Sequence, residues 1–163
     1  MTAPTTAPTL DVRDLRTSFF TKAGEVKAVN DISFTLDAGE VLGIVGESGS
    51  GKSVTGFSIL GLVDSPGRIA GGHILFKGED MLAMGEERRR QLRGSAIAAV
   101  FQDPLMTLNP VLRIGTQMVE AVRAHAKVSE AEARSRAVEA LRKVGLPSPE
   151  ERLAAYPHQF SGG

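Results

Sequence analysis

The sequence contains no cysteine, no excess of either charge and no long apolar run. Without cysteine the chain cannot form a disulfide, a thiolate metal site or a cysteine nucleophile. Nineteen basic and nineteen acidic residues cancel, so the composition offers no basic face for nucleic acid. No apolar stretch approaches the ~20 residues that a membrane-spanning helix needs. We therefore expect a soluble, cytoplasmic protein that does not bind nucleic acid.

The length of 163 residues allows one domain, or one domain and part of a second. Hydrophobic residues make up 42% of the chain, which is enough for a core. The N-terminal stretch is rich in threonine, alanine and proline, and it lacks the charged and apolar regions of a signal peptide. We expect residues 1–8 to form a disordered tail.

The clearest motif is a glycine-rich segment that fits the pattern G-x-x-x-x-G-K-[ST]. In such a loop the backbone N–H groups turn inward and hold phosphate oxygens. The lysine brings a positive charge to the β- and γ-phosphates, and the final hydroxyl can bind Mg²⁺. The motif predicts a nucleoside triphosphate site with Ser53 as a metal ligand. The predicted phosphate-binding residues are Gly46, Glu47, Ser48, Gly49, Ser50, Gly51, Lys52 and Ser53.

The segments on either side of the loop favour this interpretation over an ordinary Gly/Ser-rich connection. Residues 41–45 form a short apolar run typical of a buried parallel strand. Residues 53–62 have no charged side chain and predict a buried helix. Strand, loop and helix in this order place a phosphate at a helix N-terminus, where free N–H groups and the helix dipole favour an anion.

The rest of the first half is rich in predicted strands. Turn residues separate strands expected at 10–20 and 26–36, and a further strand is expected at 71–76. The continuous apolar run at 96–101 is typical of a second buried strand. A short charged helix is expected at 86–93.

The second half has the 3.6-residue period of helices. One helix is expected from about residue 111. A second begins with a capping box at Ser129 and ends before Gly145, whose position suits a left-handed residue after a helix. The chain is thus expected to be a strand-rich α/β half followed by a helical half, divided between residues 103 and 109.

Three stretches together resemble one family, the ATP-binding subunits of ABC transporters. Residues 45–53 resemble the Walker A loop, residues 100–104 the Q-loop, and residues 156–163 the opening of the signature motif. Their order and spacing agree with the family across nearly the whole chain. The amino-acid sequences of residues 102–110 and 156–160 are similar to those of the dipeptide and oligopeptide importer group, whose members also take up nickel or other small solutes.

The resemblance implies an α/β P-loop NTPase fold of the ABC ATPase type. Residues 9–103 would form the ATP-binding core with an antiparallel β subdomain, and residues 104–163 a partial α-helical subdomain. The implied cofactors are ATP and Mg²⁺. ATP binding and hydrolysis would be coupled to transport by a subunit held peripherally on the cytoplasmic side of the cell membrane. The implied partners are membrane-embedded permease subunits, a second identical or different ATP-binding subunit and, indirectly, a solute-binding protein.

The resemblance also implies roles for residues outside the glycine-rich loop. Gln102 is implied as a catalytic residue with Lys52, and as a second ligand of Mg²⁺. A neutral amide can ligate the ion or orient the attacking water without repelling the phosphates. Phe19 aligns with the aromatic residue that stacks on adenine, although Phe20 is adjacent and one of the two rings can belong to the core. The resemblance implies that Ser161, Gly162 and Gly163 donate hydrogen bonds to an ATP molecule bound by the opposite subunit.

Other motifs of the family do not occur in this sequence. No aspartate follows an apolar run in the manner of a Walker B motif, and the catalytic glutamate and switch histidine have no counterpart. We interpret His73 and His158 as structural residues. The chain is therefore expected to be an N-terminal fragment that lacks the C-terminal part of the sheet. It should hydrolyse ATP very poorly, because loss of a general base typically costs ~10²–10⁴ in rate.

Two alternatives stay open at this point. Another P-loop enzyme, such as a kinase or a GTPase, would leave the stretches around Gln102 and Ser161 unexplained, and a guanine-reading Asn-Lys-x-Asp motif is absent. A remnant that is inactive, or that merely binds nucleotide, is the other alternative. In a fragment, two apolar strands would have unpaired edges and uncovered faces, which favours aggregation.

Overall fold

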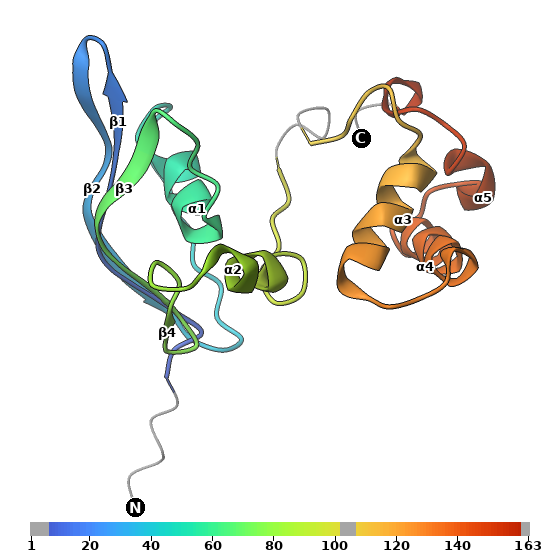
Figure 1. Cartoon of the computed structure of the whole chain (residues 1–163), viewed down its shortest axis with the longest axis horizontal. Coiled ribbons are helices and arrows are strands. Elements are labelled where there is room, and N and C mark those ends of the chain that lie inside the picture. The colour runs from blue at the N-terminus through green and yellow to red at the C-terminus, as the bar shows by residue number, and fades with distance from the viewer. Residues whose placement is uncertain (1–6, 102–106, 161–163) are drawn as a thin grey trace, which may run out of the picture. The chain divides into compact units, whose positions relative to one another are not determined.

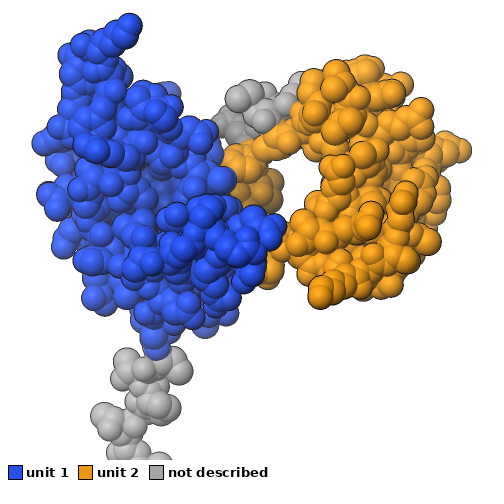
Figure 2. All heavy atoms as spheres, viewed as in Figure 1, with its two compact units in different colours: residues 1–93 blue, residues 94–163 orange. Residues whose placement is uncertain are grey.

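The computed structural model describes residues 7–101 and 107–160 (Figure 1). The chain divides into two compact units, residues 1–93 and residues 94–163 (Figure 2). The subdomain boundary predicted between residues 103 and 104 stays a prediction, since compact units and functional subdomains need not share a border.

The first unit is built on a four-stranded antiparallel sheet. Its elements are the strands β1 (Leu10–Thr21), β2 (Gly24–Leu36), β3 (Gly67–Phe76) and β4 (Glu79–Asp80), and the helices α1 (Lys52–Leu60) and α2 (Glu86–Leu92). The strand order is β2-β1-β3-β4. The strands predicted at 10–20, 26–36 and 71–76 and the helix predicted at 86–93 are confirmed, with slightly different ends.

The end of β2 alternates in exposure, as a half-buried strand does. Ile32, Phe34 and Leu36 are half-buried, whereas the intervening residues are exposed. The core of the unit contains Val12 and Leu15 of β1, with Ile74 of β3. β1 lies between β2 and β3, and α1 crosses the same sheet (Figure 1). The sheet therefore serves as the support for α1.

Two strand predictions are wrong. Residues 41–45 and 96–101 form no strand, and the second segment has only an isolated bridge at Ile97, which is half-buried. Val41, Val45 and Val100 are 93%, 92% and 101% exposed. A buried strand needs hydrogen-bonded neighbours, and no described strand pairs with either segment. The backbone of both segments therefore stays irregular and their apolar side chains face solvent, in agreement with the predicted uncovered apolar surface.

The helix predicted at 53–62 is found, but it is shorter and less buried than expected. α1 begins at Lys52 and ends at Leu60, with Gly61 in a left-handed conformation after its last turn. Only Thr55 and Ser58 of this helix are buried. The lack of charge in its sequence therefore does not mean that the whole helix is enclosed.

The second unit is a small helical assembly. It contains α3 (Ile114–His125), α4 (Glu130–Lys143), α5 (Pro149–Arg152) and the 3₁₀ helix η2 (Pro157–Gln159). Ala137, Leu141 and Leu153 form its buried centre. The N-cap and the left-handed glycine predicted for α4 are confirmed, because the Ser129 hydroxyl accepts a hydrogen bond from the Glu132 N–H and Gly145 has a φ of +76°. The reciprocal half of the predicted capping box is not formed, since the Glu132 carboxylate accepts from Arg136 instead.

Candidate functional site

The glycine-rich loop leads directly into α1, and its last residue packs against the sheet. Gly51 is the N-cap residue of α1, with a φ of +90°, and Gly49 has a φ of +81°. Glycine adopts such left-handed dihedrals without a steric cost. A Cβ on Gly51 would lie 2.3 Å from the carbonyl oxygen of Ala28 in β2. Conformation and close approach therefore both require glycine at position 51.

The side chain of Lys52 folds back over the loop. Its Nζ donates to the carbonyl oxygens of Gly46 and Glu47, at 2.7 and 2.6 Å, and to the Ser50 hydroxyl at 3.3 Å. Four of the predicted phosphate-binding residues are thus brought together around one ammonium group. The positive charge is held at the loop and is directed toward its oxygens.

The N-terminus of α1 adds unpaired donors to this charge. The Thr55 N–H donates to the Gly51 carbonyl oxygen at 2.8 Å, which is the first hydrogen bond of the helix. The N–H groups of the three preceding residues have no acceptor within a helix. The first turn of α1 carries no acidic side chain. The helix dipole and these donors therefore favour an anion at the loop.

Ser53 is placed for a second role. It lies in the first turn of α1, is exposed, and its hydroxyl has no hydrogen-bond partner in the part of the chain that the structure describes. No group of three His, Cys, Asp or Glu residues among the described residues could hold a metal ion. The Ser53 hydroxyl can therefore be one ligand of Mg²⁺. The other ligands would come from water and from phosphates held by the neighbouring ammonium and N–H groups.

The two adjacent phenylalanines have different surroundings. Phe19 is half-buried, and its Cε1 lies 2.6 Å from the point where a Cβ on Gly67 would stand, with Val63 close to the same point. Phe20 is 38% exposed, and the Arg68 guanidinium lies 4.1 Å from its ring centroid. Phe19 is therefore the more enclosed of the two rings, and its predicted stacking on adenine stays a prediction.

A buried pair of hydroxyls joins α1 to β1. Thr17 Oγ1 and Ser58 Oγ are 2.8 Å apart, and the Ser58 hydroxyl also donates to the Val54 carbonyl oxygen at 2.7 Å. At the C-terminal end of the helix, Arg93 Nη1 donates to the Leu60 carbonyl oxygen at 3.3 Å. Reasoning from the sequence missed these residues. The only local signal is the presence of hydroxyl residues in an otherwise apolar helix.

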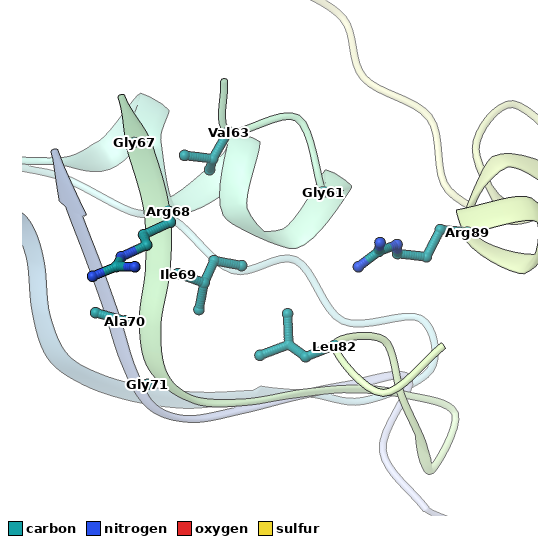
Figure 3. Close-up of a pocket in the computed structure, with 9 residues that line it drawn as sticks. All are labelled: Gly61, Val63, Gly67, Arg68, Ile69, Ala70, Gly71, Leu82 and Arg89. Atoms are coloured by element: carbon teal, nitrogen blue, oxygen red, sulfur yellow. The ribbon is translucent and has the colours of Figure 1, made fainter. Parts of the chain in front are cut away.

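A pocket of about 440 Å³ lies near the C-terminal end of α1. Its lining includes Gly61, Gly67 and Ile69, with Leu82 and Arg89 on the side of α2 (Figure 3). Ile69 and Leu82 lie toward the pocket, and Arg89 faces it from the opposite side (Figure 3). None of the predicted phosphate-binding residues lines this pocket, so it is separate from the glycine-rich loop.

The histidines make local contacts. His73 Nδ1 lies 2.8 Å from Asp80 Oδ2 across the β3–β4 turn. Burial acts to raise the pKa of Asp80, but the hydrogen bonds from His73 and from the Leu82 N–H, with the charge of His73, hold this pKa below its ordinary value. His158 stacks on Tyr156 with ring centroids 5.9 Å apart.

The remaining predicted site residues lie outside the described residues. These are Gln102 and the signature-motif residues Ser161, Gly162 and Gly163. The described part of the site therefore consists of the glycine-rich loop and α1 of the first unit. Across residues 7–101 and 107–160, the helices are all too short or too polar to cross a membrane.

Comparison with known proteins gives one family. The model of the ABC transporter family matches residues 29–163. The oligopeptide transport ATP-binding protein OppD of Bacillus subtilis is 48% identical over 155 residues, which are 94% of this chain and 43% of that protein. A putative peptide import ATP-binding protein of Brucella abortus is 50% identical over 158 residues, or 97% of this chain and 48% of that protein. The chain spans about half the length of these curated relatives.

Solved structures agree with the family model. A dimeric bacterial ABC transporter cassette superposes with a TM-score of 0.79 at 22% identity, over 94% of this chain and 63% of that chain. An ATP-binding subunit of an ABC transporter superposes with a TM-score of 0.63 at 30% identity, over 93% of this chain and 55% of that chain. The predicted fold class, an ABC ATPase core with an antiparallel β subdomain and a partial helical subdomain, is confirmed.

Proposed function

Because the chain belongs to the ABC transporter family, we propose that it is the ATP-binding part of a subunit that powers import of peptides. The observation that carries this proposal is the Lys52 ammonium group, held over the loop by the oxygens of Gly46, Glu47 and Ser50 at the N-terminus of α1. The peptide class is supported by the names of relatives that are 48% and 50% identical.

Each residue of the loop has a task in this proposal. Lys52 exchanges the loop oxygens for oxygens of the β- and γ-phosphates. The N–H groups at the start of α1 donate to the same phosphates, and the left-handed glycines keep these donors turned inward. Ser53 offers its hydroxyl to Mg²⁺, which when bound neutralises phosphate charge. Phe19 supplies a ring on which adenine stacks.

The residues of the second unit complete the proposal. Gln102 would hold Mg²⁺ together with Ser53 and would orient the attacking water, which would make it a catalytic residue together with Lys52. Ser161, Gly162 and Gly163 donate to the γ-phosphate of an ATP molecule bound by a second ATP-binding subunit. A solved relative of the fold is described as dimeric, and another is described as part of an ABC transporter complex. These descriptions support a pairing of two such subunits.

The subunit would act on the cytoplasmic side of the cell membrane, where it contacts embedded permease subunits and, through them, a solute-binding protein. Coupling of ATP hydrolysis to import is the activity proposed for the whole protein. A kinase or GTPase is not favoured, since the ABC transporter model extends over the loop and over the second unit.

Mg-ATP binding tests the nucleotide site directly. Calorimetric titration of the full chain should give saturable binding for the wild type and for Lys22→Ala, an exposed lysine of the β1–β2 turn. Lys52→Ala should bind at least about tenfold more weakly, because a charge-assisted contact to phosphate is lost. Equal binding by the two lysine variants would refute the site, and absence of binding in the wild type would favour an inactive remnant.

A chimera tests the peptide class. Replacement of the matching segment of Bacillus subtilis OppD by this chain should support growth on an oligopeptide as the source of a required amino acid. The same chimera with Lys52→Ala should not support growth. Failure of the unmodified chimera, when it accumulates to the level of the native OppD, would contradict the assignment to peptide import.

A further inference from the structure

α1 is only partly enclosed, and its apolar side chains are half-buried. Its two buried residues, Thr55 and Ser58, both carry hydroxyl groups. A Cβ on Gly56, in the middle of the helix, would meet no atom within 4 Å. Apolar burial is not directional, so half-buried apolar side chains alone allow a helix to slide or rotate by small amounts. Hydrogen bonds lose strength steeply as their angle changes, and they can fix such a helix.

The contacts of Thr17 and Ser58 determine which hydroxyl donates and which accepts. The Ser58 hydroxyl has one hydrogen, which it donates to the Val54 carbonyl oxygen at 2.7 Å. Thr17 Oγ1 must therefore donate to Ser58 Oγ across the 2.8 Å that separates them. Thr17 and Ser58 are 0% and 1% exposed. Water cannot replace either partner, so the bond from β1 to α1 persists.

A second hydroxyl extends the connection to the loop. The Thr55 hydroxyl and the Thr55 N–H both donate to the Gly51 carbonyl oxygen, at 3.0 and 2.8 Å. Gly51 is the last loop residue before α1, and a Cβ on it would collide with the Ala28 carbonyl oxygen of β2. A displacement of α1 along β1 therefore moves the end of the loop that presents the N–H donors.

We propose that Thr17 and Ser58 are positioning residues for the phosphate-binding loop, and that their buried hydrogen bond fixes α1 on β1 in the orientation that phosphate binding needs. The proposal rests on the proposed function of the loop. Neither side chain touches nucleotide. Their effect on affinity passes through the place and the rigidity of α1.

Four variants separate positioning from simple stability. Thr17→Val removes the donor while keeping the side-chain shape, and Ser58→Ala removes the acceptor. The double variant replaces both partners by apolar groups, which can be nearly neutral for stability. Thr17→Ser keeps the hydroxyl and serves as the rescue. Ser33→Ala is the matched control, because the Ser33 hydroxyl makes an exposed contact with Asp14 in the same sheet.

The full chain is used for three measurements: urea unfolding, Mg-ATP affinity, and the NMR line widths of the loop amides of Gly46, Gly49 and Gly51. We expect the double variant to regain most of the wild-type stability. It should still bind Mg-ATP about two- to tenfold more weakly, the range expected for a single hydrogen bond. Its loop amides should broaden. Thr17→Ser and Ser33→Ala should resemble the wild type in affinity and line width.

The proposal is overturned if affinity and line width follow stability across all variants, or if the double variant has wild-type affinity and line widths. Failure of the proposed function looks different. In that case the wild type shows no Mg-ATP binding that depends on Lys52. The positioning role is then tested by the NMR line widths alone. Unchanged line widths of the loop amides in the double variant would reject it.

Discussion

Gly51 lies so close to Ala28 that any side chain at position 51 would collide with the β2 backbone. A Cβ there would stand 2.3 Å from the Ala28 carbonyl oxygen, and the φ of Gly51 is +90°. Gly49 has a similar φ of +81°, but a Cβ on Gly49 would meet nothing within 4 Å. The two glycines thus share a left-handed backbone but differ in the space around them.

We expect Gly51→Ala to lower the free energy of unfolding by about 2–4 kcal/mol, from backbone strain and overpacking together. Gly49→Ala should cost only the strain, about 1–2 kcal/mol. Urea unfolding of the two variants measures the difference. Equal losses would show that the contact with Ala28 does not constrain the loop.

The second prediction concerns the opposite end of α1. Arg93 donates to the Leu60 carbonyl oxygen and pairs with Glu86 at 2.5 Å, and its side chain is only 22% exposed. Removal of this positive group from a helix C-terminus in Arg93→Gln should cost about 0.5–1.5 kcal/mol of stability. Arg90→Gln is the control, because Arg90 pairs with Glu87 on an exposed surface and such pairs contribute about 0–1 kcal/mol.

Thermal unfolding in low and high salt distinguishes the two variants. The loss in Arg93→Gln should persist at high salt in large part, since its bond to the Leu60 carbonyl is partly shielded from solvent. A loss that disappears at high salt would assign Arg93 to ordinary surface electrostatics.

The third prediction is a pH dependence at the β3–β4 turn. The folded-state pKa of Asp80 lies below the ordinary 3.8, because its hydrogen bonds with His73 and the Leu82 N–H outweigh the opposing effect of burial. The ionised carboxylate therefore stabilises the fold above this ordinary value. This stabilisation is lost as the pH falls from 3.8 through the lower folded pKa.

Asp80→Asn should remove that part of the acid sensitivity. Urea midpoints of the wild type and the variant, compared at neutral pH and below the ordinary carboxyl range, should differ more at neutral pH. A constant difference would mean that the carboxylate charge of Asp80 does not contribute.

The structural features that were predicted correctly carry local signals. The helix after the glycine-rich loop, the second strand of the sheet and the N-cap at Ser129 are each defined within a few neighbouring residues. The bond between Thr17 and Ser58 spans 41 positions in sequence, and no local pattern specifies it. The apolar runs at 41–45 and 96–101 misled the prediction, because apolar composition signals a strand only where other strands are there to pair with it.

These apolar runs give the fourth prediction. Val41 and Val45 are almost fully exposed. Val41→Thr combined with Val45→Thr should reduce self-association in sedimentation velocity, since solvent-exposed valines promote aggregation. The free energy of unfolding of this double variant should differ from that of the wild type by less than about 0.5 kcal/mol.

Val12→Thr is the buried control, because Val12 is only 1% exposed. It should destabilise the chain and increase self-association. If the exposed double variant associates as strongly as the wild type, another surface of the chain is responsible.

The contacts of Lys52 have a kinetic consequence. Its ammonium group already lies against the loop through Gly46, Glu47 and Ser50. In the proposed function, an arriving phosphate would exchange with the oxygens that hold the lysine, with no slow search for a loop conformation. The association rate should therefore fall with rising ionic strength, as charge attraction dictates, and should show no lag.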